Sequence, residues 1–399
     1  MNELVTLVKK YEAPLLAFLR DLVRLKSVNG RHPEKAVAER IVAEAENLEL
    51  DGRLVAKEPL RPNALVRWGN GSRGFALIGH MDTVAAGDTS QWTSPPFEPV
   101  VRNGRLYGRG TADNKAGLAI GLYTLAALRD EGKLNPHDVT LVLAGVADEE
   151  SGASSDLGVR YLLDEGHLPV QGAIYTYASD IVCVGHRGLL RLVLTAQGTA
   201  VHSGSDQWSR GEGGVNAVTG LAAILLQLEQ LQLPYEPHSA FDHLGFTMTP
   251  GTLFSGGEFE SMVPGAATAV IDCRLMPGQT PEAVLDAVQG IIGAECANRP
   301  GLRVDIQVKN RLPAAAIPAE HPLAQIAQRH AQALTGKAWP IRGAGPANEG
   351  YMLINASIPT LPGFGPTGDN AHAPDEWVAM DSLMETAVIY ATIISDYLS

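Results

Sequence analysis

The sequence predicts an α/β protein with a mostly parallel sheet covered by helices on both faces and a smaller α+β domain inserted into the chain. Its length of 399 residues exceeds the size at which a single hydrophobic core usually divides. Strand-like and helix-like segments alternate through the first half of the chain. After Gly185-His-Arg-Gly188 the pattern changes to a strand that is apolar on one face only.

The first domain is predicted to comprise residues 1–186 and 313–399. Its apolar residues recur at helical spacing or in short continuous runs. The expected elements are helices over roughly 1–26, 34–44, 116–128, 156–165, 322–334 and 382–397, and strands over 63–68, 75–78, 139–146 and 173–177.

Residues 187–312 are predicted to form the inserted domain. The expected elements, in chain order, are a strand over 189–198, a helix over 215–231, a strand over 267–274, a helix over 281–292 and a strand over 302–308. This order resembles a β-α-β-β-α-β unit, which is a compact motif able to bury one face of its sheet.

Composition excludes several kinds of partner. A net charge of −13 disfavours binding to nucleic acid or to an anionic membrane. No apolar stretch reaches the roughly 18 residues needed to span a bilayer, and the first residues lack a signal-peptide core. The three cysteines are too few and too widely spaced for a disulfide framework. We therefore expect a cytoplasmic protein that acts on a small molecule.

One glycine motif matches a nucleotide-binding pattern in its letters only. The segment Gly69-Asn-Gly-Ser-Arg-Gly74 fits G-x-G-x-x-G, but it leads into a predicted strand. Phosphate binding by this motif requires a helix N-terminus directly after it. We interpret the segment as a hairpin turn.

Charged side chains gather where predicted strands end. His80 and Asp82 follow one strand, and the adjacent pair Glu149 and Glu150 follows another. A metal-bound imidazole commonly donates its second N–H to a carboxylate, which suits His-x-Asp. Neighbouring carboxylates diverge, so one could bind a metal while the other faces a water molecule. Considered alone, each pair also fits an ordinary buried histidine or a solvated loop.

Three further candidates lie in predicted loops of the same domain. Asp113 lies in a glycine-rich turn before an apolar helix, where it also fits a helix cap. Asp180 follows a strand, and His372 lies in a polar loop. Open α/β sheets bind ligands at the carboxyl ends of their strands. The predicted metal ligands are His80, Asp113, Glu150, Asp180 and His372.

Charge balance favours two metal ions. Two divalent cations carry about +4, which three carboxylates and one hydroxide balance with about −4. Asp113, Glu150 and Asp180 supply these carboxylates, while the two histidines bind as neutral imidazoles. A ligand set of His, Asp and Glu without Cys suits zinc, cobalt or manganese.

In this order, the motifs resemble a family of zinc peptidases and deacylases. The family includes glutamate carboxypeptidase, aminoacylase, acetylornithine deacetylase, succinyl-diaminopimelate desuccinylase and carnosine-type dipeptidases, and the resemblance covers essentially the whole chain. The segments that carry it are Gly79-His-Met-Asp-Thr-Val84, Tyr107-Gly-Arg-Gly-Thr-Ala-Asp-Asn-Lys-Ala-Gly117, Asp148-Glu-Glu150, His202-Ser-Gly204, Asn216-Ala217, Asp272-Cys-Arg274 and Ala371-His-Ala373.

The resemblance implies a role for each candidate in the first domain. His80 and Asp180 would hold one zinc ion, Glu150 and His372 the other, and Asp113 would bridge them. In the same scheme Asp82 orients His80, and Glu149 is the general base.

The resemblance also implies that the inserted domain is a lid through which two chains form a homodimer. His202 would reach the partner's site and stabilise the oxyanion, and Arg274 would bind a substrate carboxylate. Asn216 is a further substrate-binding candidate. Ser261 replaces an asparagine that many family members have at its position, so substrate contacts there are expected to differ.

The predicted activity is hydrolysis of an amide C–N bond in a small peptide or amino-acid derivative. Two Zn²⁺ ions, replaceable by Co²⁺ or Mn²⁺, would serve as cofactors, with Glu149 as base. An aspartate at position 180 resembles the dipeptidase and aminopeptidase branches of the family, which favours a peptide substrate. Deacylation of an N-acyl-amino acid and binding without turnover are the alternatives.

Overall fold

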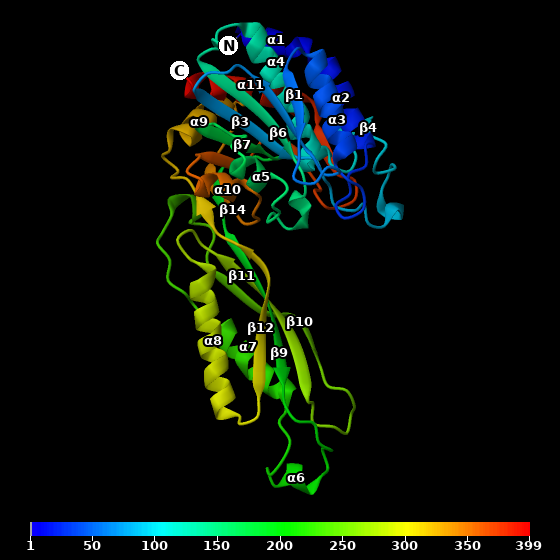
Figure 1. The fold of residues 1–399 in the computed structure, drawn as a ribbon, viewed down its shortest axis with the longest axis vertical. Coiled ribbons are helices and arrows are strands. Elements are labelled where there is room, and N and C mark those ends of the chain that lie inside the picture. Colours follow the sequence, from blue (N-terminus) through cyan, green and yellow to red (C-terminus); the bar gives the residue numbers. More distant parts are fainter. Residues whose placement is uncertain (1) are drawn as a thin grey trace. The chain divides into compact units, whose positions relative to one another are not determined.

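The computed structural model describes residues 2–399, and the chain folds into two compact units (Figure 1). The first unit contains the residues up to Gly185 together with Ala316–Ala344 and Asn348–Ser399. The second contains His186–Ala315 and the short segment Gly345–Ala347, whose return to this unit has no signal in the sequence pattern. Within residues 2–399, no helix combines the length and apolar character required to cross a membrane.

A six-stranded sheet forms the centre of the first unit. Its strands, in spatial order, are β1 (Asp51–Val55), β2 (Asn63–Trp68), β6 (Val139–Val146), β3 (Arg73–His80), β7 (Gly172–Thr176) and β15 (Thr360–Phe364). The last four run parallel to one another, whereas β1 and β2 pair antiparallel. All eight residues of β6 are buried, as expected for a parallel strand covered on both faces. The predicted mostly parallel sheet is confirmed.

The helices of the first unit pack against this sheet or against one another. They are α1 (Asn2–Lys10), α2 (Glu12–Arg24), α3 (Lys35–Asn47), α4 (Ala116–Glu131), α5 (Val159–Asp164), α9 (Pro322–Thr335), α10 (Gly350–Asn355) and α11 (Met380–Tyr397). Helix α4 packs on β3 and β6, and α3 packs on β1 and β2. At Gly117, a side chain would collide with Thr176 of β7, so glycine permits this close approach. The single helix predicted at the N-terminus is two helices, because the chain turns at Tyr11.

Two smaller sheets contain further strands of the chain. One contains β16 (Gly368–Asp369), β17 (Trp377–Ala379), β5 (Arg105–Tyr107) and β4 (Val100–Arg102), and another contains β13 (Ala315–Ala316), β8 (Val182–His186) and β14 (Ile341–Ala344). In the first of these, Trp377 of β17 lies opposite Tyr107 of β5. This pairing brings the loop containing His372 close to the loop containing Asp113.

The second unit is an antiparallel sheet with two long helices. Its strands, in spatial order, are β10 (Thr247–Gly256), β11 (Ala266–Leu275), β9 (Gly188–Gln197) and β12 (Arg303–Leu312), and its helices are α6 (Asp206–Ser209), α7 (Ala217–Glu229) and α8 (Pro281–Asn298). Apart from the one-turn helix α6, the chain order is the predicted β-α-β-β-α-β. Strand β10 was not predicted, because it is largely exposed and contains both proline and glycine.

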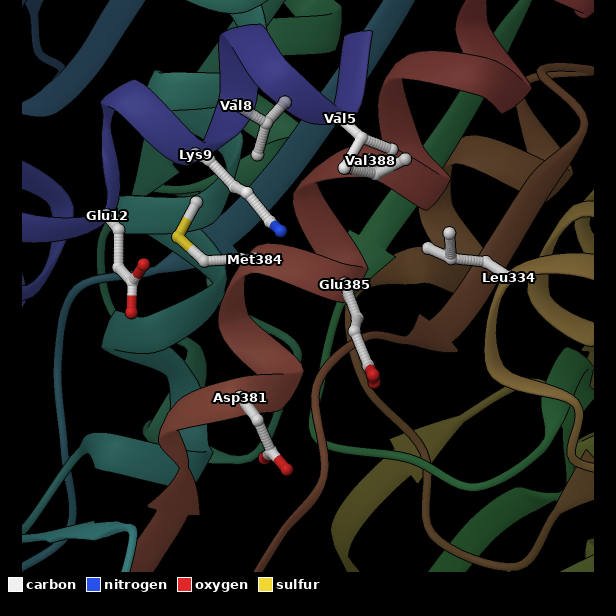
Figure 2. Close-up of a pocket in the computed structure, with 9 residues that line it drawn as sticks. All are labelled: Val5, Val8, Lys9, Glu12, Leu334, Asp381, Met384, Glu385 and Val388. Carbon is white, nitrogen blue, oxygen red and sulfur yellow. The ribbon is translucent and has the colours of Figure 1, made fainter. Parts of the chain in front are cut away.

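Helices α1, α9 and α11 surround a hollow of about 240 Å³ in the first unit (Figure 2). Its lining contains apolar and charged side chains, namely Val5, Val8, Lys9, Glu12, Leu334, Asp381, Met384, Glu385 and Val388. None of the predicted metal ligands lines it, so the functional site lies elsewhere.

Candidate metal centre

Strand register brings the candidate residues to one edge of the central sheet. His80 is the last residue of β3 and lies opposite Val146, the last residue of the parallel strand β6. Glu149 and Glu150 follow β6 directly, in a single helical turn. Because parallel strands end at a common edge, the imidazole and the carboxylate pair meet where such sheets usually bind ligands.

The carboxylate of Asp113 lies between two imidazoles. Its Oδ1 is 2.7 Å from His80 Nε2, and its Oδ2 is 3.3 Å from His372 Nε2. Glu150 Oε1 is 3.1 Å from the same nitrogen of His372. Ligand atoms of His80, Glu149 and Glu150 lie within 4.8 Å of one another, as do those of Asp113, Glu150 and His372. Four of the five predicted ligands therefore come together, with Glu149 beside them.

Burial and charge shift the pKa values of His80, Glu149 and His372. Burial raises the pKa of Glu149 to about 8; the charge of His80 opposes this shift, whereas the charges of Asp113 and Glu150 add to it. Burial alone would lower the pKa of His80. The charge and the hydrogen bond of the Asp113 carboxylate raise this pKa, and it lies well above its ordinary value. Hydrogen bonds with Asp113 and Glu150 raise the pKa of His372 to about 10. The cluster thus attracts positive charge, and its nitrogen and oxygen donors fit a divalent metal such as zinc.

Asp82 supports both the imidazole and the carboxylate pair. His80 Nδ1 is 2.9 Å from the backbone carbonyl oxygen of Asp82 and 3.5 Å from its carboxylate. The carboxylate accepts hydrogen bonds from the backbone N–H groups of Glu149 and Glu150, at 3.2 and 3.0 Å, and from the side chain of Asn29 at 2.7 Å. Asp82 therefore also holds the turn that carries the carboxylate pair.

Asp82 also belongs to a second group of carboxylates. Ligand atoms of Glu34, Asp82 and Asp148 are within 4.8 Å of one another. Arg61 forms ion pairs with Glu34 and, at 2.8 Å, with Asp148, while Asn29 donates to Asp148 at 2.9 Å. Because a guanidinium and an amide already supply the donors, this group supports the metal centre and is not a separate metal site.

The loop carrying Asp113 is held by a residue to which the sequence analysis gave no role. The buried carboxylate of Glu376 accepts hydrogen bonds from the backbone N–H groups of Gly110, Ala112 and Asp113 at 2.8–3.0 Å. Arg109 forms an ion pair with it at 2.6 Å. The only signal in the sequence is an acidic residue four positions after His372, and nothing there connects it to a loop more than 250 residues earlier.

Asp180 does not join the cluster. It is exposed, and it lines a hollow of about 180 Å³ together with Trp339 and Ile389. Tyr177 instead lies beside His80, with a distance of 5.7 Å between the ring centroids. Tyr177 was predicted only as the last residue of a strand over 173–177, with no role in the site.

The predicted lid residues lie in the second unit. His202 is exposed, and its Nδ1 accepts a hydrogen bond from the N–H of Gly204 at 3.0 Å. A single β-bridge joins His202 to Met262. The carbonyl oxygen of Ser261 accepts a hydrogen bond from the N–H of Ser203 at 2.8 Å. His202 and Ser261 therefore lie on neighbouring segments.

The other two lid candidates have partners within the second unit. Arg274 and Arg191 both pair with Asp272, with N–O distances of 2.7 and 2.5 Å. The side-chain oxygen of Asn216 accepts a hydrogen bond from the N–H of Thr219 at 3.0 Å and so caps α7. Asn216 thus caps a helix, and two guanidinium groups share the Asp272 carboxylate.

Fold and cluster together define the class of protein, which is a metal-dependent hydrolase. The model of Peptidase family M20/M25/M40 matches residues 76–396, and the chain belongs to this family. This membership confirms the resemblance predicted from the motifs. One relative is a probable succinyl-diaminopimelate desuccinylase from Staphylococcus epidermidis, which is 28% identical over 417 residues, covering 97% of this chain and 98% of the relative.

Solved structures share the fold across the whole chain. The M20 family metallo-carboxypeptidase of Sulfolobus solfataricus superposes with a TM-score of 0.75 at 18% identity, covering 96% of this chain and 99% of that one. A dinuclear metal-binding peptidase of the same family from Bacillus subtilis gives a TM-score of 0.72 at 15% identity, with coverages of 98% and 99%. These similarities establish a common architecture.

Proposed function

We propose that the chain is a zinc-dependent hydrolase that binds two divalent cations and cleaves an amide C–N bond in a small peptide or amino-acid derivative. The observation that carries this proposal is the position of Asp113, which directs one oxygen towards His80 and the other towards His372. A carboxylate placed in this way is suited to bridge two ions. Co²⁺ and Mn²⁺ accept the same donor types and are expected to replace zinc.

Two metal positions follow from this arrangement. Asp113, Glu150 and His372 would hold one ion, and His80 with Asp113 the other. When bound, the ions would polarise the scissile carbonyl group and lower the pKa of water. His80 and Asp113 are deeply buried, whereas the side chain of His372 is 55% exposed.

Glu149 is the proposed general base. Its carboxylate is buried and lies next to the ligand atoms of His80 and Glu150. It would accept a proton from the attacking water and then donate that proton to the nitrogen of the leaving amine.

The substrate is proposed to carry a carboxylate that Arg274 binds. Arg274 and Arg191 share the single carboxylate of Asp272, so the local charge is positive. Deacylation of an N-acyl-amino acid is the second candidate activity, and the desuccinylase name of the relative favours it. The earlier preference for a peptide depended on Asp180 as a ligand, and it loses its support because Asp180 lies outside the cluster.

Metal removal and reconstitution test the proposed function. We expect chelation to abolish hydrolysis and Zn²⁺, Co²⁺ or Mn²⁺ to restore it. A screen of the reconstituted chain on dipeptides, acetyl-amino acids and succinyl-amino acids then identifies the substrate class. Metal binding without hydrolysis of any of these amides would favour the remaining alternative, a binding protein that does not turn its ligand over.

We also propose that the second unit is a lid through which two chains form a homodimer, and that the partner subunit's His202 stabilises the oxyanion. Strand β10 is at the edge of its sheet and exposes Leu253 by 67%, while α7, which packs on β10, exposes Leu226 by 65%. Exposed apolar side chains next to an unpaired strand edge are usually covered by a partner.

Light scattering is expected to report a dimer for the unaltered chain. The double variant Leu226→Lys/Leu253→Lys should dissociate it, because charged side chains would be buried in the interface. Leu60→Lys, at a residue in the first unit that is 63% exposed, is the matched control and should remain dimeric. A monomeric unaltered chain would contradict both the dimer and the role of His202.

The cytoplasm is the proposed location. All three cysteines are free thiols, and burial raises the pKa of Cys183 to about 11 and that of Cys273 to about 12. Buried thiols that hold their protons are inert and are common in a reducing compartment.

A further inference from the structure

The two imidazoles of the metal centre have different surroundings. His372 Nε2 lies 3.1 Å from Glu150 and 3.3 Å from Asp113, so three protein groups converge on that position. His80 Nε2 has Asp113 at 2.7 Å as its short carboxylate contact. The residues that form a group of possible metal ligands with His80 are Glu149 and Glu150, while the Asp82 carboxylate lies 3.5 Å from the other ring nitrogen, Nδ1.

Strand register determines which side chain lies next to His80. Strands β3 and β7 are parallel, with Ile78 opposite Tyr175. Two residues further on, His80 and Tyr177 reach the edge of the sheet together, and their ring centroids are 5.7 Å apart. The side chain that follows the end of β7 beside His80 is therefore an aromatic ring. Tyrosine is not among the usual zinc ligands, which are Cys, His, Asp and Glu.

Neither Glu149 nor Glu150 can serve as the missing ligand at His80 and also keep its proposed role. If Glu149 bound the ion at His80, its carboxylate would no longer be free to accept a proton from water. Glu150 is 3.1 Å from His372 and belongs to the other position. Asp180 lies in a separate hollow beside Trp339. The position at His80 is therefore one protein ligand short.

We propose that the two metal positions are unequal: Asp113, Glu150 and His372 hold one ion tightly, whereas the ion at His80 is held weakly because Tyr177 occupies the place of its third ligand. This inference rests on the proposed two-metal function. It goes beyond that function by assigning a specific residue of this chain to the low affinity of one ion.

Calorimetric titration of the chelator-treated full chain with Co²⁺ measures both affinities without relying on catalysis. We expect one tight equivalent and a second that binds at least about 100-fold more weakly, since loss of even an outer partner of a ligand costs about 10- to 100-fold in affinity. Two equivalents of equal affinity would overturn the inference but leave the proposed function intact. Absence of any tight equivalent would count against the proposed function itself.

Substitutions at Tyr177 test the cause. Tyr177→Glu supplies a carboxylate at the end of β7, and it should tighten the second equivalent at least about 10-fold. It should also change the visible absorption of Co²⁺ that develops with this equivalent. Tyr177→Phe keeps the ring and is the matched control, with both affinities unchanged. Equal second affinities in the Glu and Phe variants, with circular dichroism showing that both fold, would overturn the assignment.

Three further variants keep the inference testable if Tyr177→Glu fails to fold. His372→Ala should lose the tight equivalent, whereas His80→Ala should keep it and lose the weak one. Asp180→Ala should leave both affinities unchanged. Loss of an equivalent in Asp180→Ala would identify that residue as a ligand and overturn the inference, as would loss of the tight equivalent in His80→Ala.

Discussion

Glu149→Gln is expected to lower kcat by about 10²- to 10⁴-fold, the usual contribution of a positioned general base. Glutamine has nearly the same shape as glutamate but cannot accept the proton that water must lose. The backbone N–H of Glu149, which donates to Asp82, is unaffected by this change. The ligand set of Asp113, Glu150 and His372 also remains, so the folded variant should retain its tightly bound metal.

Steady-state kinetics on the substrate found in the screen, with metal analysis of the same sample, measures this effect. Glu320→Gln removes a carboxylate from an exposed surface position and is the matched control, with no expected change. Retention of more than about a tenth of the activity by Glu149→Gln would remove Glu149 as the base. If the variant also loses the tightly bound metal ion, Glu149 is a metal ligand instead.

Glu376→Ala is expected to lower the free energy of unfolding of the first unit by about 3–5 kcal/mol, the usual cost of breaking a buried ion pair from one side. The Arg109 guanidinium would be left buried without its carboxylate, and three backbone N–H groups of the Asp113 loop would lose their acceptor. Because Asp113 is the proposed bridge between the ions, we also expect weaker metal binding by the folded variant.

Urea denaturation combined with cobalt titration measures both consequences. Glu376→Gln retains one acceptor oxygen and is expected to lose less stability than the alanine variant. In the double variant Arg109→Met/Glu376→Ala no charge is left unpaired, so its loss of stability should be smaller than the sum of the two single losses. Strict additivity would show that the buried pair is not coupled and would contradict its role in holding the loop.

Residues that follow long buried strands were predictable from the sequence. The run 139–146 is apolar apart from Thr140 and short enough for a covered strand, which predicted that Glu149 and Glu150 lie just beyond its end. The same reasoning placed His80 at the end of β3. Because parallel strands end at a common edge, these local patterns were sufficient to bring three chemically important side chains together.

Tyr177 and Glu376 were not predictable in the same way. The sequence suggested Asp180 as a ligand because a carboxylate after a strand has the right chemistry. However, β7 ends at Thr176, and its register with β3 presents Tyr177 to His80 instead. Asp180 lies three residues beyond Tyr177 in an irregular segment, where the direction of each side chain depends on the local backbone. Amino-acid composition does not reveal that direction.

By itself, the sequence determined the class of fold, the type of donor atoms and the approximate place of the metal centre, because these depend on hydrophobic periodicity and on residue chemistry along the chain. Only the tertiary structure decided which carboxylates share an imidazole, which residue anchors the Asp113 loop and which side chain stands next to His80. Those relations depend on strand register and on contacts between segments more than 250 residues apart, such as Arg109 and Glu376. They are set by the packing of the whole unit, so no local pattern in the chain records them.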